Sequence, residues 1–380
     1  MSEKKLITLL LLFYFSISIG QQKDTIYGKV KKIREKVIFL TEKENPKLFA
    51  VDGDYGHSGF MGPESTISRF RSIWFSTQFC YFINYERHFN ENGLLTEDIW
   101  YDKEDSIHRY YRFEYDNKNR IIRKIDSINE LVYTDTHYYK RDIHETIISQ
   151  NSNFDFFNYK YKKYDREGNL IRLKSIDEYG TMDEYIFNYN NNGKLLYRIY
   201  KNPNSWKQEK PGTWSYGVQD SIGNIYKDLV NKYDESNKLI QSQRFDLYED
   251  EEYHKQPKLV ETTNYQYQKN NLVLTKHMSN YMKPQPTYVH YLYDEKNRLI
   301  KKYCCSEKES NAIRIEKYRY ENDEIKFLDY TEVSYPSKEM KTHRISFVYK
   351  YDDRGNWNEI VKKVDGIQLY KWIRQIEYFN

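Results

Sequence analysis

The octapeptide YDREGNLI, residues 164–171, decides the fold, because variants of it recur along most of the chain. The good copies are YDNKNRII from Tyr115, YNNNGKLL from Tyr189, YDESNKLI from Tyr233, YDEKNRLI from Tyr293 and YDDRGNWN from Tyr351. Weaker copies begin at Phe89 and Tyr267, with traces at Tyr139 and Tyr320. A unit that recurs in this way indicates one repeat array rather than two or three unrelated domains.

Each copy is expected to form a β-hairpin around a tight turn. Before the turn, aromatic and polar residues alternate, as in Phe187-Asn188-Tyr189, which is the period of a half-buried strand. An acidic residue that can accept hydrogen bonds from nearby backbone amides follows in most copies, as Asp116, Asp165, Asp234, Asp294 or Asp352. Three residues later stands Gly168, Gly193 or Gly355, replaced in other copies by Asn119, Asn237 or Asn297. Because Gly and Asn best tolerate positive φ, this interchange predicts a left-handed residue in a type I turn with a G1 bulge.

The spacing of the copies predicts how the hairpins are joined. The interval from Tyr164 to Tyr189 nearly equals that from Tyr267 to Tyr293, and each leaves room for two strands and two turns of an antiparallel meander. The chain holds 40 Tyr and 19 Phe, so tyrosine is the expected core residue, with its hydroxyl at a polar partner. Strand twist curls long sheets. The prediction is an all-β fold, an elongated and curled antiparallel β-meander of repeated hairpins.

The pattern Y-D-x-x-G-x-L, over roughly residues 81–380, resembles the YD repeat of RHS proteins and of Tc toxin C components. The resemblance implies a curled β-sheet of many hairpins, which in the large members is a hollow shell around a toxic domain. The chain has no P-x-x-x-x-D-P-x-G boundary motif, and the stretch after Gly355 is too short for a toxin domain. We therefore expect a short exported member of the family without a toxin domain.

The N-terminal segment 1–20 is typical of a cleavable signal peptide. Lys4 and Lys5 precede an apolar core from Leu6 to Ile19, and small residues stand before a cleavage site after Gly20. The alternative is an uncleaved N-terminal anchor, although the apolar run is short for a membrane span. We expect three segments: the signal peptide over 1–20, N-terminal cap strands and a Gly-rich loop over 21–80, and the hairpin array over 81–380. The mature chain is then secreted or periplasmic, with no transmembrane span.

Charge and cysteine content exclude some classes of protein. The formal net charge is only +4 with both signs interspersed, which argues against a nucleic-acid partner. The three cysteines are Cys80, Cys304 and Cys305, and the expectation is that they are inert. The alternatives are a bridge from Cys80 to one of the other two, or a vicinal bridge between these two. The nine histidines are scattered, so neither a metal site nor a cofactor is expected.

Two stretches are candidates for ligand contact. Residues 51–65 contain four glycines together with Asp52, Asp54 and His57, which form an incomplete calcium loop and an incomplete nucleophile elbow. An insertion over residues 201–220 carries Trp206 and Trp214, a pair that could stack on a sugar ring or pin the loop to its own sheet.

The sequence contains no catalytic motif, so the favoured function is an exported, non-catalytic repeat protein of the cell envelope. It would bind or scaffold through an aromatic-lined β surface, with an envelope glycan or a protein as ligand. One alternative is a carrier or accessory shell related to RHS-type toxin or secretion systems. The second is a glycan-active enzyme, which would require two carboxylates facing each other across the aromatic surface.

Overall fold

A computed structural model describes residues 26–40, 71, 84–101, 105–128, 131–141, 143–151, 154–177, 182–202, 204–210, 213–218, 224–246, 257–280, 286–306, 312–333 and 339–380. Every element in these ranges is a β-strand. Among the described residues, no helix is long and apolar enough to cross a membrane. The signal-peptide prediction for residues 1–20 lies outside the described residues, as does most of the segment 41–83 that was expected to form a cap and loop.

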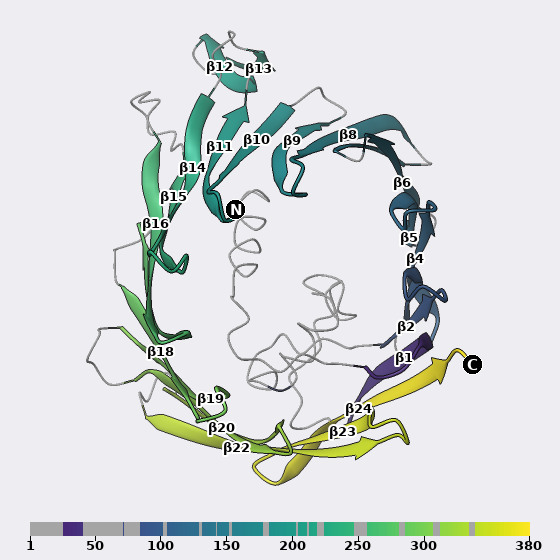
Figure 1. Cartoon of the computed structure of the whole chain (residues 1–380), viewed down its shortest axis with the longest axis vertical. Helices are drawn as coiled ribbons and strands as arrows, with labels where there is room; N and C mark the ends of the chain where they lie inside the picture. Colours follow the sequence, from purple (N-terminus) through teal and green to yellow (C-terminus); the bar gives the residue numbers. More distant parts are fainter. Residues whose placement is uncertain are drawn as a thin grey trace. The chain divides into compact units, whose positions relative to one another are not determined.

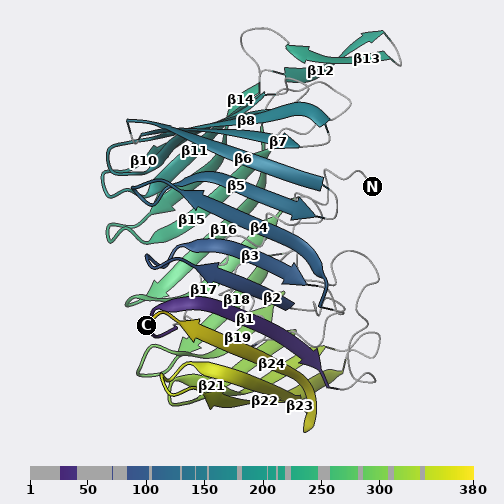
Figure 2. The same ribbon diagram turned by 90° about the vertical axis from the view of Figure 1, so that its right-hand side faces the viewer.

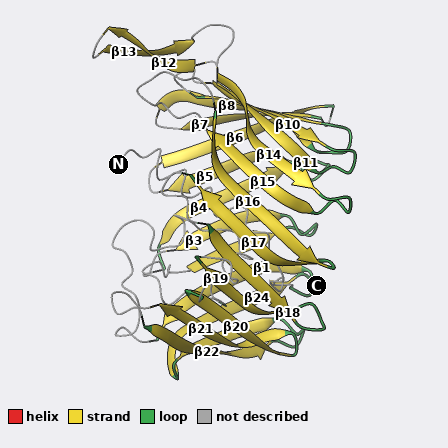
Figure 3. Ribbon diagram, turned by 90° about the vertical axis from the view of Figure 1, so that its left-hand side faces the viewer, coloured by secondary structure: helices red, strands yellow, loops and turns green. Residues whose placement is uncertain are grey.

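The strands are β1 (Val30–Phe39), β2 (Asn84–Phe89), β3 (Leu95–Tyr101), β4 (Ile107–Tyr115), β5 (Ile121–Ile128), β6 (Leu131–Lys140), β7 (His144–Asn151), β8 (Phe154–Tyr164), β9 (Leu170–Ile176), β10 (Met182–Tyr189), β11 (Leu195–Asn202), β12 (Asn204–Lys210), β13 (Thr213–Val218), β14 (Asn224–Tyr233), β15 (Leu239–Asp246), β16 (Lys258–Gln268), β17 (Asn271–Ser279), β18 (Thr287–Tyr293), β19 (Leu299–Cys305), β20 (Arg314–Glu321), β21 (Glu324–Val333), β22 (Met340–Tyr351), β23 (Trp357–Val364) and β24 (Ile367–Tyr378). Twenty-two of them belong to one sheet, while β12 and β13 form a separate two-stranded sheet (Figure 3). The predicted all-β antiparallel meander of hairpins is confirmed.

The chain divides into two compact units. The first comprises Met1–Tyr110, Tyr267–Val273 and Val289–Asn380, and the second comprises Tyr111–Gln266 and Leu274–Tyr288. In the second unit, strands β5 to β11 pair in chain order, β14 pairs with β11, and β15 and β16 continue the series. All of these pairings are antiparallel, as in a meander interrupted by the β12–β13 hairpin.

The first unit contains the strands nearest to both ends of the described chain. Strands β19 to β24 pair in order, and β1 is hydrogen-bonded to β24 on one side and to β2 on the other. Figures 1 and 2 show β1 lying between β24 and β2. The prediction of an elongated sheet is wrong in this respect, because the first and last described strands pair and neither leaves a free edge. The hairpin spacing contained no signal for this contact between strands far apart in the sequence.

The turns have the backbone geometry that their residues favour. Asn119, Asn237 and Asn297 have φ of 62°, 59° and 60°, and Gly168 has φ of 87°. In the turn after β8, the amide of Gly168 donates to the Asp165 carbonyl and the amide of Asp165 donates to the Asn169 carbonyl. The Asp165 side chain also accepts from the Asn169 amide at 2.7 Å. The side chain of the acidic residue thus fixes the turn from within.

In several repeats the first tyrosine contributes its hydroxyl as well as its ring. Tyr189 donates to the carbonyl of Leu170 at 2.9 Å, and Tyr320 donates to that of Leu299 at 2.9 Å. Each acceptor is the first strand residue after the turn of an earlier repeat. Phenylalanine could fill the same volume but could not make this bond, so the ladder of hydroxyls is a physical reason for tyrosine at this position.

Candidate functional site

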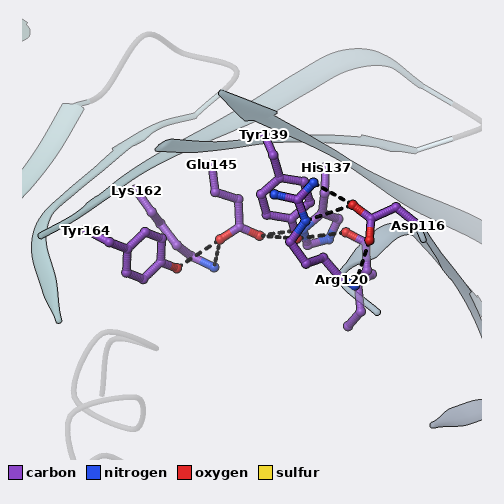
Figure 4. A network of polar contacts seen from close by, with 8 residues as sticks. Asp116, Arg120, His137, Tyr139, Glu145, Lys162 and Tyr164 are labelled. Carbon is purple, nitrogen blue, oxygen red and sulfur yellow. Dashed lines mark hydrogen bonds and ion pairs between the residues drawn. The ribbon is translucent and has the colours of Figure 1, made fainter. Parts of the chain in front are cut away.

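Glu145 on β7 is the centre of a network of polar side chains in the second unit (Figure 4). Only 6% of the residue is exposed. Its carboxylate accepts hydrogen bonds from Lys162 Nζ and the Tyr164 hydroxyl, both at 3.0 Å, and from the Tyr139 hydroxyl at 3.3 Å. The Nδ1 atom of His137 lies 2.7 Å from Glu145 Oε1. Both carboxylate oxygens are therefore occupied by groups from the flanking strands β6 and β8.

The network holds the carboxylate ionised and the phenols neutral. Burial raises the pKa of Glu145, but the contacts with His137, Lys162 and Tyr164 outweigh burial and leave this pKa below its ordinary value. Burial, reinforced by the charge of Glu145, raises the pKa of Tyr139 to about 12. The same causes raise the pKa of Tyr164. A carboxyl group with a lowered pKa is a poor general acid at neutral pH, so this arrangement favours structure and binding over proton transfer.

A second ion pair joins the turn before β5 to the network. Arg120 donates from Nε to Asp116 Oδ2 at 2.7 Å, and its Nη2 lies 2.6 Å from the same oxygen. The Arg120 guanidinium also lies over the Tyr139 ring, 4.2 Å from the centroid. The hydrogen bond from Arg120 lowers the pKa of Asp116. Through Arg120, the turn that contains Asp116 contacts Tyr139 of the following hairpin.

Glu145 belongs to a longer row of side chains that crosses seven strands. Register partners in an antiparallel sheet share a face, and here the partners run continuously from β6 to β14. We call this set the tyrosine row: Tyr139, Glu145, Lys162, Leu173, Tyr185, Tyr200 and Tyr226. At ~4.8 Å per strand, the row is about 29 Å long.

The far end of the tyrosine row is aromatic. The Tyr185 and Tyr200 rings lie 5.1 Å apart between centroids, and those of Tyr200 and Tyr226 lie 5.6 Å apart. The Tyr200 hydroxyl donates to Asp183 at 2.6 Å, and the Tyr226 hydroxyl donates to Asp246 at 3.4 Å. The row thus combines half-buried rings with oriented carboxylates, the two kinds of group that polar ligands with apolar faces require.

A β-bulge places a charge beside these rings. The register between β11 and β14 shifts after Arg198, so Asp228 is the extra residue opposite it. Arg198 donates from Nε and Nη2 to the Asp228 carboxylate, with Nη2 to Oδ2 at 2.5 Å. The Arg198 guanidinium also lies 4.8 Å from the centroid of the Tyr185 ring. Asp228 and Arg198 therefore fix the position of Tyr185.

Sequence reasoning missed a recurrent ion pair between adjacent hairpins. In each pair, a basic side chain that follows one turn contacts a buried carboxylate. The carboxylate stands shortly before the tyrosine of the next repeat, whether that repeat is a good or a weaker copy. The pairs are Arg172–Glu184, Arg198–Asp228, Arg244–Glu261 and Lys302–Glu316. The signal was present in the sequence, since each carboxylate stands four to six residues before the tyrosine and each base four to seven residues after the turn Gly or Asn.

Most of the predicted ligand contacts cannot be placed in this network. Asp52, Asp54 and His57 lie outside the described residues, as does Cys80. Trp206 and Trp214 stand on β12 and β13, opposite Tyr216 and Gln208 in the register.

The described cysteines and metal-binding residue types form no site. Cys304 and Cys305 are free thiols, so the vicinal bridge considered from the sequence is not formed. Burial raises the pKa of both thiols. No group of three His, Cys, Asp or Glu residues within the described ranges could hold a metal ion.

Comparison with known proteins corrects the family resemblance. No family model matches the chain, and no curated protein matches it. Among solved structures, the chain is similar to a porin-like protein from Bacteroides uniformis, with 9% identity, a TM-score of 0.24, and coverage of 93% of this chain and 100% of that one. The assignment to the YD-repeat proteins is therefore wrong: no family model matches the chain, and the first and last described strands of the sheet pair with each other instead of ending an elongated array.

Proposed function

We propose that the protein is an exported, non-enzymatic component of the cell envelope that binds an envelope polymer through the tyrosine row. The observation that carries the proposal is the row itself, which aligns rings and charged groups across seven paired strands. Sugar rings have apolar faces and polar edges. The Tyr185, Tyr200 and Tyr226 rings offer faces, and the carboxylates of Asp183 and Asp246 offer acceptors beside them.

The state of the carboxylates supports binding over hydrolysis. A glycosidase needs one carboxylic acid with a raised pKa and a second carboxylate facing it. On this face the pKa of Glu145 is lowered, and Asp228 is held by Arg198 in a two-nitrogen contact. Asp183 and Asp246 accept hydrogen bonds from tyrosines of the row. These contacts give each carboxylate a positioning role.

The pairing of β1 with β24 bears on how the row is presented. A sheet whose first and last strands are joined has no free edge there for aggregation with other chains. We propose that this joined edge keeps the sheet from pairing with other chains and makes it a stable support for a binding face in the envelope.

The test is a binding screen of residues 21–380 against envelope polysaccharides and detergent-solubilised envelope proteins, read by intrinsic fluorescence and by co-sedimentation. Saturable binding that Tyr185→Ala or Tyr226→Ala weakens at least tenfold would support the row as the binding surface. A Trp206→Ala/Trp214→Ala variant tests the β12–β13 hairpin separately. If binding fails only in that variant, the hairpin and not the row is the site. If no polymer binds, the proposed function is wrong, and binding of an envelope protein alone would assign the row to a protein partner instead.

A further inference from the structure

The opposite face of the same unit carries exposed aromatic side chains on β6 and β8. Tyr138 is 56% exposed, Tyr159 is 42% exposed and Phe157 is 40% exposed. The register places Tyr138, Thr146 and Tyr161 opposite one another on β6, β7 and β8. Since cross-strand partners share a face, these aromatics lie together on the face that does not contain Glu145. Neighbouring large apolar groups in solvent indicate an interaction surface.

The rings on β8 form a regular series. Phe157, Tyr159 and Tyr161 stand at alternate positions, so they project from the same side of the strand. The Phe157 and Tyr159 ring centroids are 6.4 Å apart, with 34° between the planes. Tyr161 is stacked on His144 with centroids 5.7 Å apart and 26° between the planes. The series therefore offers successive ring faces along the strand to an extended ligand.

Positive charge gathers at one end of this series. Lys140, His144 and Lys163 are register partners across β6, β7 and β8, and Lys174 on β9 is the partner of Tyr161. Within the described residues, these three lysines make no ion pair. By contrast, Lys162 on the other face is paired with Glu145. The end of the series near the β6–β7 turn thus has cationic groups without partners, which attract an anion.

The spaces between the aromatics carry neutral hydrogen-bonding groups. Thr136 and Thr134 on β6 share the face with Tyr138, and Gln150 on β7 is the register partner of Phe157. Hydroxyl and amide groups both donate and accept, as sugar hydroxyls require of their partners. We call the whole set the aromatic–basic patch: Lys140, Tyr138, Thr134, Thr136, His144, Thr146, Gln150, Phe157, Tyr159, Tyr161, Lys163 and Lys174.

We propose that the aromatic–basic patch binds an anionic polysaccharide. The chain lies along β8 with its sugar rings stacked on Phe157, Tyr159 and Tyr161, and its acidic group lies at Lys140, Lys163 and Lys174. The distribution of charge favours this occupant over nucleic acid. A nucleic acid carries a phosphate at every nucleotide and would require basic side chains along the whole series of rings. These lysines are confined to one end of the series. This surface is separate from the tyrosine row and is tested independently of it.

The experiment measures affinity by isothermal titration of the full mature chain with matched probes. Polygalacturonate supplies carboxylates, its methyl-esterified form supplies the same sugars without charge, and a phosphomannan supplies phosphate. We expect one of the two anionic polymers to bind, with affinity that falls as salt is raised. Tyr159→Ala and the double variant Lys140→Gln/Lys163→Gln should each weaken that binding about tenfold or more. The anionic polymer that binds identifies the acidic group.

Matched controls separate this site from the tyrosine row. Tyr200→Ala should leave binding to the patch unchanged, and the urea midpoint of each variant reports whether it is folded. The proposal is overturned if neither anionic polymer binds, if the esterified polymer binds equally well, or if Tyr159→Ala binds like the wild type. Tighter binding of a single-stranded oligothymidylate would assign the patch to nucleic acid and would also overturn it. If all sugar polymers bind without sensitivity to these variants, the patch is excluded while the proposed function stands.

Discussion

Replacing Glu145 by alanine should destabilise the second unit by about 3 kcal/mol, because it removes the acceptor for four side chains. Breaking a buried ion pair costs about 3–5 kcal/mol when the remaining charge stays buried. The lower end applies here because 27% of the Lys162 side chain is exposed and can recover water, whereas His137 is only 11% exposed. Glu145→Gln keeps one acceptor oxygen, but it loses the charge and replaces the other acceptor by an NH2 group, so its cost should be smaller than that of alanine without vanishing.

The assay is urea unfolding followed by circular dichroism, with Glu167→Ala in the exposed turn after β8 as the control, expected within ~0.5 kcal/mol of the wild type. The effect also has a defined pH dependence. Because the folded pKa of Glu145 is lowered, its ionised form adds stability above the unfolded pKa of about 4.3, and this contribution is lost as pH falls through the folded pKa. The advantage of the wild type over Glu145→Gln should therefore shrink in acid. An alanine variant as stable as the Glu167 control would refute the reasoning.

Further substitutions test three features: the turns, the hydroxyl ladder and the contact between the two ends. Tyr189→Phe should cost about 1 kcal/mol in urea unfolding, while Tyr293→Phe, whose buried hydroxyl has no partner among the described residues, should cost less; equal costs would contradict the ladder. Gly168 has φ of 87°, and nothing lies within 4 Å of the position that a Cβ would occupy. It should accept asparagine with little loss of stability, whereas valine should cost about 1–2 kcal/mol, and a neutral valine variant would contradict this. Arg374→Ala should cost about 3–5 kcal/mol and expose β1 to limited proteolysis, because Glu35 would be left buried without its partner; protection equal to the wild type would disprove the role of this pair.

The local structure could be predicted from the sequence because its signals are local. Alternation of aromatic and polar residues sets the strand period, and the conformational freedom of Gly or Asn sets the turn, so the antiparallel meander followed from short stretches such as that at Tyr164. The contact of β1 with β24 could not be predicted in this way. The segment from Ile26 to Leu40 shows strand character, but nothing in its residue pattern indicates which strand it pairs with.

The candidate site was harder to predict from the sequence than the fold, for a related reason. A row such as Tyr139, Glu145 and Lys162 exists only once the register between strands is known, and a shift of one residue would send each side chain to the other face. The aromatic content did predict a tyrosine-rich surface. It could not indicate that the polar residues of that surface would be satisfied by one another, because cross-strand partners are 6 to 17 positions apart in sequence.

The ion pairs within the array differ from the pair that joins its ends, and the difference has a physical reason. In the local pairs the base remains accessible: the Arg172, Arg198 and Lys302 side chains are 46%, 30% and 37% exposed. Glu35 and Arg374, which join β1 to β24, are each only 2% exposed, and Arg374 also lies 3.5 Å from the centroid of the Trp357 ring.

The strands that the local pairs join are linked by chain segments far shorter than the one between β1 and β24, so an accessible ion pair there adds stability without having to select an alignment. The strands β1 and β24 have no turn between them. A buried charge pair makes every misaligned register costly, because a slip would leave two charges desolvated and unpaired. We infer that Glu35 and Arg374 select the alignment of the joined ends, and accordingly that a Glu35→Leu/Arg374→Leu double variant would retain more stability than either single variant while permitting register slips. Disulfide trapping of cysteines placed at register pairs such as Val37 and Trp372 measures this directly, and a single trapped alignment in the double variant would contradict the inference.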